Sequence, residues 1–176
     1  MTDVPDRLTL KRHRDLEGIS SAAIWMRRAI LGLIAVLCLA GLANVFGQRP
    51  ESASADVPAA KISLYAPSAI RGGDFMEARF HITAKRDIKK ATLKLDPGWA
   101  EGLSVNEIEP SPLGQASDNG RLSLTLGHIP AGQSFILFMQ FQVNPTNLAW
   151  RRPQNVELDD GDQVLAIIHH SLTVYP

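Results

Sequence analysis

Four of the five histidines are the side chains that come nearest to a metal-binding pattern in this chain. His169 and His170 are adjacent, whereas His81 and His128 lie far from them. Neighbouring residues of a strand point to opposite faces, so the adjacent pair cannot chelate one metal ion, and a site would need His81 or His128 to approach across strands. No cysteine or carboxylate spacing supports such a site. We therefore predict solvated or core-edge histidines and no metal centre.

The acidic run Asp159-Asp160-Gly161-Asp162 has a composition that suits calcium. It lacks the alternating Asp-x-Asp-x-Asp-Gly order and the distal glutamate that wrap the ion in calcium-binding loops. Asp-Gly is instead a strong signal for a tight hairpin turn. We therefore predict a turn between two strands at this run, without a bound cation.

No pattern typical of an enzyme active site occurs in the chain. A nucleophile elbow, a P-loop, a dinucleotide-binding fingerprint, a zinc motif and a carboxylate pair in a recognisable context are all missing from the sequence. Serine, histidine and aspartate are present, as in any chain, but without a spacing that joins a nucleophile to a base. We predict no catalytic residue and no cofactor, and an enzyme is the least favoured class.

The long connection 144–155 contains Trp150-Arg151-Arg152, and these residue types dominate the hot spots of protein interfaces. We predict that Trp150, Arg151 and Arg152 form a surface for a partner protein. The alternative is that Trp150 closes the open end of the predicted domain, and the sequence does not choose between the two.

A basic cluster of Lys85, Arg86, Lys89 and Lys90 surrounds a predicted hairpin. Such a cluster can face anionic lipid headgroups or an acidic partner. The favoured alternative is a solvated turn and strand edge, where lysines prevent edge-to-edge pairing. Residues 50–176 carry 11 Lys and Arg against 14 Asp and Glu, so this part of the chain is mildly acidic and we predict no binding to nucleic acid.

Residues 29–48 contain no charged residue and are long enough, at about 1.5 Å per residue, to cross a hydrocarbon layer of about 30 Å as a helix. The polar tail 1–28 has six basic residues, whereas only Arg49 follows the apolar segment before Lys61. Basic residues close to a spanning helix stay in the cytoplasm. We predict a single-pass protein of the bacterial plasma (inner) membrane, with a cytoplasmic N-terminus and a periplasmic or extracellular C-terminal domain.

A cleaved signal peptide is the alternative, because Ala53-Ser54-Ala55 has the small-x-small pattern of a cleavage site. The 28 residues before the apolar segment and its 20 residues both exceed the usual lengths in signal peptides. An uncleaved anchor is therefore favoured. Residues 49–60, rich in Pro, Ser and Ala, predict a short, semi-extended linker.

Residues 61–176 show the alternation of apolar and polar residues that is typical of half-buried strands. It is clearest over 75–84 and 135–143, and turn residues lie at 71–74, 118–120, 130–133 and 159–162. Further strands are predicted around 62–65, 92–95, 103–108, 121–126, 156–158 and 164–174. The fold class is therefore mainly β: one N-terminal transmembrane helix and an antiparallel immunoglobulin-like β-sandwich. The Cys, Trp, Cys core of antibody domains is missing.

The stretch 126–134 (LGHIPAGQS) before a long alternating strand, together with Gly73-Asp74-Phe75 at the start of an earlier one, resembles bacterial immunoglobulin-like or fibronectin-like surface modules. In those modules a Pro-x-Gly corner passes the chain between sheets. The anchor followed by one domain is similar to single-pass proteins of bacterial envelopes. The resemblance implies adhesion, spacing or complex assembly rather than catalysis.

We therefore predict a membrane-anchored extracytoplasmic interaction or accessory module that is not catalytic and that supports the assembly or stability of an envelope protein complex. Its expected partners are membrane lipid, through the helix, and another envelope or membrane protein. The alternative is a periplasmic ligand-binding or adhesion domain, anchored or released by signal-peptide cleavage.

Overall fold

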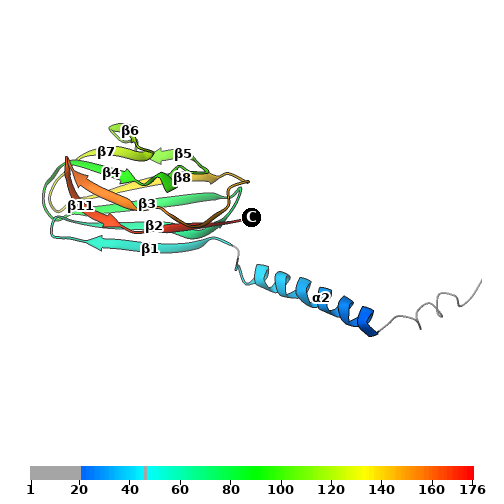
Figure 1. Cartoon of the computed structure of the whole chain (residues 1–176). Helices are drawn as coiled ribbons and strands as arrows, with labels where there is room; N and C mark the ends of the chain where they lie inside the picture. Colours follow the sequence, from blue (N-terminus) through cyan, green and yellow to red (C-terminus); the bar gives the residue numbers. More distant parts are fainter. Residues whose placement is uncertain (1–20, 46) are drawn as a thin grey trace, which may run out of the picture. The chain divides into compact units, whose positions relative to one another are not determined.

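The computed structural model describes residues 21–45 and 47–176, and of residue 118 only the backbone. The chain divides between residues 45 and 46 into two compact units, a helical one and a β unit (Figure 1). Residues 1–20 of the predicted cytoplasmic tail lie outside the described residues.

Helix α2 (Ser21–Leu42) is long and apolar enough to cross a membrane, as judged by length and composition. Its bounds differ from the predicted span 29–48, because charge alone does not end a helix and Arg27 and Arg28 are good helix formers. The helix stops at Leu42, and Asn44 then takes a φ of 54°, a left-handed conformation that commonly follows a helix C-terminus. The helix therefore begins before the uncharged segment and ends six residues before the predicted end of the span.

The β unit is a sandwich of two sheets that enclose one hydrophobic core. Sheet A has seven strands in the order β5-β8-β3-β2-β12-β9, with β1 beside β2, and sheet B has the order β11-β10-β4-β7-β6. All pairs are antiparallel except the parallel pair β2 and β12. The architecture confirms the predicted immunoglobulin-like β-sandwich. The strands of sheet A are β1 (Arg49–Asp56), β2 (Ala60–Arg71), β3 (Phe75–Ala84), β5 (Leu103–Glu109), β8 (Ser134–Val143), β9 (Ala149–Pro153) and β12 (Ser171–Tyr175), and those of sheet B are β4 (Ile88–Leu95), β6 (Gly114–Asp118), β7 (Arg121–Ile129), β10 (Val156–Asp160) and β11 (Gln163–Ile168).

The corner at 130–133 passes the chain from β7 in sheet B to β8 in sheet A, as the resemblance implied. Gly132 has a φ of 82°, and its N–H donates to the carbonyl of Ala84 over 2.8 Å. Residues 85–90, by contrast, do not belong to the predicted hairpin. The preceding strand β3 lies in sheet A and β4, which begins at Ile88, lies in sheet B, so residues 85–87 cross between the sheets.

Residues 49–60 are not a linker over most of their length, because residues 49–56 form strand β1. All eight residues of β1 pair with β2 in antiparallel register. Ala53 and Ala55 alternate with exposed serines and pack against the core. Alanine and serine differ little in hydrophobicity, so the alternation in Ser-Ala-Ser-Ala is a weak sign of a strand. The same residues are also typical of the semi-extended linker that the composition predicted.

The predicted last strand 164–174 is two strands, because β11 pairs within sheet B and β12 pairs within sheet A. The chain changes sheets at His169 and His170, which belong to neither strand. The connection 144–155 also contains a strand, β9, at an edge of sheet A. The turn predicted at 159–162 is confirmed as the β10–β11 hairpin, with Gly161 at a φ of 61°.

Trp99 is the largest side chain at the centre of the core, with 1% of its surface exposed. It ends the short 3-10 helix η1 (Pro97–Trp99), which follows the sheet B strand β4. Its ring centroid lies 5.7 Å from that of Phe80 and 5.5 Å from that of Phe141, both on sheet A. Trp99 therefore connects the two sheets through aromatic contacts.

Gly98 must lack a side chain for Trp99 to reach this place. A Cβ atom at Gly98 would lie 2.0 Å from the carbonyl oxygen of Pro153, which is backbone and has no rotamer to change. Gln154, fully buried, also donates from Nε2 to the carbonyl of Gly98 over 3.1 Å. The approach of η1 to the segment around residue 153 is therefore as close as glycine allows.

Replacing Gly98 with alanine is expected to destabilise the β unit by about 3 kcal/mol, because η1 and Trp99 must shift out of a packed core. Urea unfolding of the full chain in detergent, followed by tryptophan fluorescence, measures this loss. The control is Gly114→Ala, where the new Cβ meets the Thr125 side chain at an ordinary 3.6 Å. Equal stability of the two variants would contradict the role given to Gly98.

Candidate binding face

A row of aromatic and basic side chains crosses the outward face of sheet A. The strand register places Tyr65 of β2 opposite Arg79 of β3, and Arg79 opposite Phe138 of β8. The guanidinium carbon of Arg79 lies 5.9 Å from the ring centroid of Tyr65 and 5.0 Å from that of Phe138. Tyr65 is 44% exposed and Phe138 37% exposed. Both ring contacts fall within cation–π range and hold the three side chains as one group.

Ile136 extends this row along β8, because it lies two residues before Phe138 and on the same face. It is 41% exposed. We call Tyr65, Arg79, Ile136 and Phe138 the binding face. The outward face of a sheet is normally polar, so exposed aromatic and branched side chains grouped around an arginine indicate a contact surface.

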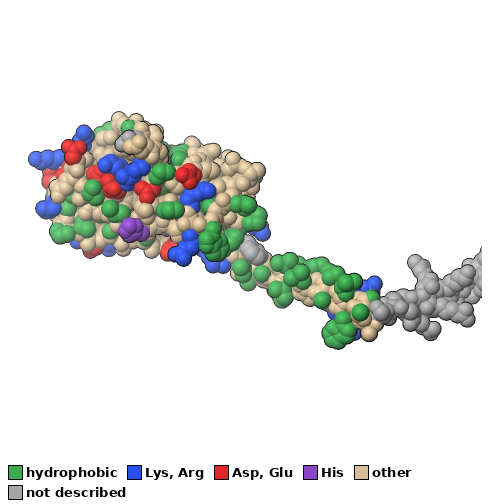
Figure 2. Space-filling model, viewed as in Figure 1, with side chains coloured by type: hydrophobic (Ala, Val, Ile, Leu, Met, Phe, Trp, Pro, Cys, Tyr) green, Lys and Arg blue, Asp and Glu red, His purple; other side chains and the backbone are tan. Residues whose placement is uncertain are grey.

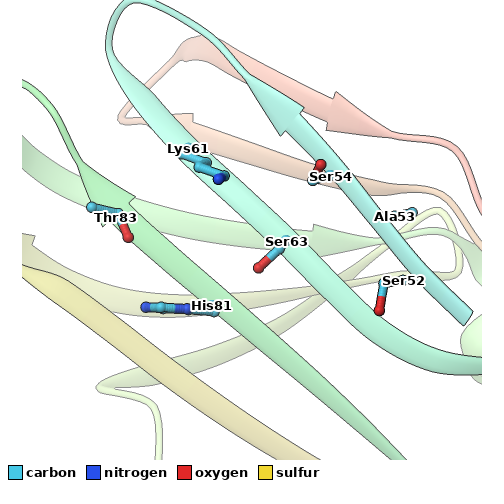
Figure 3. A pocket seen from close by; sticks show the side chains of 7 residues that line it. All are labelled: Ser52, Ala53, Ser54, Lys61, Ser63, His81 and Thr83. Atoms are coloured by element: carbon cyan, nitrogen blue, oxygen red, sulfur yellow. The ribbon is translucent and has the colours of Figure 1, made fainter.

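A polar groove of about 300 Å³ adjoins the binding face (Figure 3). The register places Ser54 of β1 opposite Ser63 of β2, and Ser63 opposite His81 of β3. Strand β1 therefore forms one wall of the groove, which the sequence prediction of a linker missed. The residues that line it are Ser52, Ala53, Ser54, Lys61, Ser63, His81 and Thr83.

The groove offers hydroxyl, imidazole and ammonium groups, but no prearranged nucleophile and base. No hydrogen bond joins His81 to Ser54 or Ser63, all of which the structure describes. Within residues 21–45 and 47–176, no group of three or more His, Cys, Asp or Glu side chains is placed to hold a metal ion. The groove is therefore suited to binding polar or acidic groups by hydrogen bonds.

The other side of the binding face is acidic. Glu77, Glu107 and Glu109 surround a second depression of about 240 Å³ that Phe138 also lines. Glu77 Oε1 lies 3.2 Å from the Arg79 guanidinium. The outward surface of sheet A therefore runs from a groove with Lys61 and His81, over the aromatic row, to a carboxylate cluster.

Three of the four histidines singled out in the sequence have separate partners, and the fourth, His81, lines the polar groove. His169 Nδ1 lies 3.2 Å from Asn155 Oδ1, and His128 Nε2 lies 2.7 Å from Asp87 Oδ1. His170 is buried and its ring stacks on Trp99 at a centroid distance of 6.2 Å. The reason given for separating His169 from His170 was wrong, since neither lies in a strand, but their side chains do bind different groups.

His170 is the buried histidine of this set, and burial lowers the pKa of its imidazole. Its Nε2–H donates to the carbonyl of Pro67 over 3.2 Å, and this bond and the charge of Glu51 oppose the shift only in part. The native state therefore resists protonation at a pH where the unfolded chain accepts a proton. By linkage, stability that is present above a pH of about 6.5 is lost as the pH falls below it.

We expect His170→Gln to remove about 1 kcal/mol of the stability loss between pH 7.5 and 5.5, because glutamine does not titrate and keeps a donor for the carbonyl of Pro67. Urea unfolding of both proteins at each pH measures the difference. His169→Gln serves as the control, because His169 is exposed, and it should keep the full pH dependence. A pH profile of His170→Gln that matches the unchanged protein would contradict this assignment.

An ion-pair network on sheet B explains the acidic run that resembles a calcium site. Asp159 has only 1% of its side chain exposed, and Lys94 Nζ lies 2.5 Å from its Oδ2. Lys94 also lies 3.5 Å from Glu157, and Arg121 lies 2.9 Å from Glu157 and 3.2 Å from Asp96.

Burial and the charge of Glu157 raise the pKa of Asp159 against the influence of Lys94. Burial also opposes the ionisation of Glu157, but Arg121 and Lys94 hold its pKa below the ordinary value.

Replacing Lys94 with methionine should destabilise the β unit by about 3 kcal/mol at pH 7, since Asp159 would stay buried without its cation. The pKa of Asp159 is already raised, so protonation at lower pH removes the uncompensated charge. The deficit relative to the unchanged protein should therefore shrink as the pH falls from 7 towards 5, which unfolding at several pH values measures. Lys89→Met, at an exposed position, is the control; an undiminished deficit at low pH would contradict the explanation.

The predicted partner surface Trp150-Arg151-Arg152 lies on the edge strand β9. Trp150 is 77% exposed, so it does not close the sandwich, and Trp99 fills the core instead. Arg152 is mostly covered: it donates to Asn147 Oδ1 over 2.9 Å and to the carbonyl of Glu101. Use of this surface by a partner stays a prediction, with Trp150 and Arg151 as its accessible members.

Of the predicted basic cluster, Lys85 and Arg86 lie where the chain crosses from β3 to β4, whereas Lys89 and Lys90 lie at the start of β4. Lys85 pairs with Asp56, the last residue of β1, and this hydrogen bond lowers the pKa of Asp56. The cluster therefore sits at the opposite end of β1 from Arg49. Contact of these residues with lipid or an acidic partner stays a prediction.

No family model and no curated protein sequence matches the chain. Among solved structures, it is similar to the solution structure of CaCohA2 from Clostridium acetobutylicum, at 13% identity and a TM-score of 0.40, over 59% of this chain and 83% of that one. It is also similar to an immunoglobulin-like protein from Pseudomonas aeruginosa, at 14% identity and a TM-score of 0.32, over 71% and 97%. A third similarity is to a GH20 exo-β-N-acetylglucosaminidase from Vibrio harveyi, at 11% identity and a TM-score of 0.26, over 73% and 18%. These scores are too low to transfer any function to this chain.

Proposed function

We propose that this chain is a membrane-anchored, extracytoplasmic interaction module that is not catalytic and that binds a partner protein on the outward face of sheet A. The observation that carries the proposal is the row Tyr65, Arg79 and Phe138, which is held together by two cation–π contacts yet exposed. Tyrosine and arginine are enriched among the residues that dominate protein interfaces. The flanking groove and carboxylate cluster supply the polar rim of such an interface.

The anchor in this proposal is helix α2, with the N-terminus in the cytoplasm of a bacterium and the β unit outside the inner membrane. Arg27 and Arg28 near its start, together with the basic residues of the preceding tail, favour this orientation by the positive-inside rule. The partner is then another envelope or membrane protein, and the module supports the assembly or stability of their complex.

Strand β1 supports an anchor that is retained rather than cleaved. Processing after Ala55 would remove all of β1 except Asp56. The edge of β2 that β1 covers would then be open, and the groove would lose the wall formed by Ser52 and Ser54. An open strand edge invites aggregation.

A ligand-binding domain is the second candidate, and the groove is the observation that favours it. Lys61, His81 and the serine hydroxyls suit a small anionic or hydroxylated ligand. The two functions differ in what they require: a protein partner needs Phe138 and Arg79, whereas a small ligand in the groove needs Lys61.

We expect a photo-crosslinking amino acid at the exposed position Gln140 to capture one discrete protein in intact cells, because Gln140 lies on β8 beside the binding face. Arg79→Glu in the same chain should reduce the crosslinked product at least about tenfold, since loss of a central hot-spot residue costs about 2 kcal/mol or more. Immunoblotting and mass spectrometry of the product measure the effect.

A second test and its matched control use two exposed isoleucines on different sheets. Ile136→Ser on the binding face should weaken capture, whereas Ile167→Ser on β11 of sheet B should not, although the two side chains are 41% and 46% exposed. Capture that survives Arg79→Glu and Ile136→Ser would contradict the proposal. If Lys61→Ala abolishes the binding of a small anionic ligand to the purified protein while the crosslinked product is unchanged, the ligand-binding alternative is favoured.

A further inference from the structure

Three large apolar side chains are exposed at one end of the β unit. Phe75 is 53% exposed, Leu148 is 63% exposed and Trp150 is 77% exposed. Phe75 shares the outward face of β3 with Arg79 but lies four residues away, at the first position of the strand. Figure 2 shows apolar side chains at the right-hand end of the β unit, with Lys and Arg side chains among them.

The backbone pairings place these residues around the start of β1. Arg49 pairs with Ala69 of β2, and Ala69 also pairs with β12, whose next residue pairs with Ala149 of β9. Ala149 stands between Leu148 and Trp150 in the sequence. The side-chain amide of Gln48 donates to the carbonyl of Phe75 over 2.5 Å. The start of β1 and the exposed apolar residues therefore share one end of the sandwich.

Basic side chains accompany the apolar ones at this end. Arg71, the last residue of β2, and Arg151 of β9 are both exposed. Arg151 is held at a φ of 49° and donates its N–H to Thr173 Oγ1 over 3.3 Å. Asp74 is an exposed acid in the neighbouring loop. We call Phe75, Leu148, Trp150, Arg71 and Arg151 the tether end.

The chain leaves little distance between the tether end and helix α2. The helix ends at Leu42 and β1 begins at Arg49, so residues 43–48 connect them. Six residues span at most about 20 Å when extended. If α2 crosses the membrane, the start of β1 at Arg49 therefore stays within about 20 Å of the end of α2, and within the β unit the tether end is the end that contains Arg49.

We propose that the tether end contacts the surface of the lipid bilayer that α2 crosses. Trp150, Leu148 and Phe75 enter the headgroup region, and the guanidinium groups of Arg71 and Arg151 bind lipid phosphates. Tryptophan favours this interface because its ring is apolar and its N–H remains hydrogen-bonded, and arginine reaches phosphates from an apolar base. The inference rests on the proposed anchoring by α2.

Tryptophan quenching tests this contact in the full chain. The variant Trp25→Phe retains Trp99, which is buried, and Trp150, which is exposed. In vesicles of phosphatidylcholine and phosphatidylglycerol brominated on the upper acyl chain, we expect the emission of Trp150 to be quenched and to shift to shorter wavelength, because an indole at the membrane interface lies close to these bromine atoms. The double variant Trp25→Phe, Trp150→Phe gives the background from Trp99.

A tryptophan at the far end provides the matched control. Lys89→Trp in the double variant places one exposed indole in the basic cluster, where we expect no quenching by brominated lipid and free access of aqueous iodide. Quenching of Trp150 no greater than the Trp99 background would overturn the proposal, and so would quenching of the tryptophan at position 89. The variant Trp150→Phe, which keeps Trp25 and the buried Trp99, separates the two failures: if its quenching does not exceed the Trp99 background, the anchoring itself is wrong.

Discussion

The contact of Trp99 with Phe80 and Phe141 is the constraint on which the rest of the β unit depends. Trp99 follows a strand of sheet B, while its two aromatic neighbours belong to sheet A, so this contact fixes how the sheets face each other. Side chains alternate along a strand, and an inward Phe80 requires an outward Arg79. The packing of the core therefore also decides which residues form the binding face outside it.

The sequence predicted those strands in which large apolar residues alternate with polar ones. The bounds of β3 at 75–84 are confirmed, and β8 begins only one residue before the predicted row. Strand β1 was not predicted, because its inward residues are alanines. Their small apolar surface makes the alternation of a strand hard to distinguish from a linker rich in Ser and Ala. Strands β11 and β12 were predicted as one strand, because no glycine or proline marks the position at His169 where the chain changes sheets.

The candidate site was less accessible to sequence reasoning than the fold. Alternation within one strand shows only which of its residues share a face. The register between strands brings Arg79 and Phe138 together with Tyr65, although Tyr65 and Phe138 are 73 positions apart in the sequence. Register depends on turns and on the fit of the core, neither of which one strand reveals. Trp150 was singled out by its type alone, and its exposure confirms that it is accessible, whereas Arg152 is engaged by Asn147 and Glu101.

The pairing of β1 with β2 also determines how the domain responds to mechanical force. Any tension between a membrane-held helix and a bound partner enters the sandwich at Arg49, the first residue of β1. After a shift of register between Arg49 and Pro50, residues 50–56 pair with β2 in one continuous register. A pull along the strand axis loads the hydrogen bonds of this ladder together, in shear, instead of breaking them one at a time. A pull along the axis of β1 would therefore load this ladder before it loads the core.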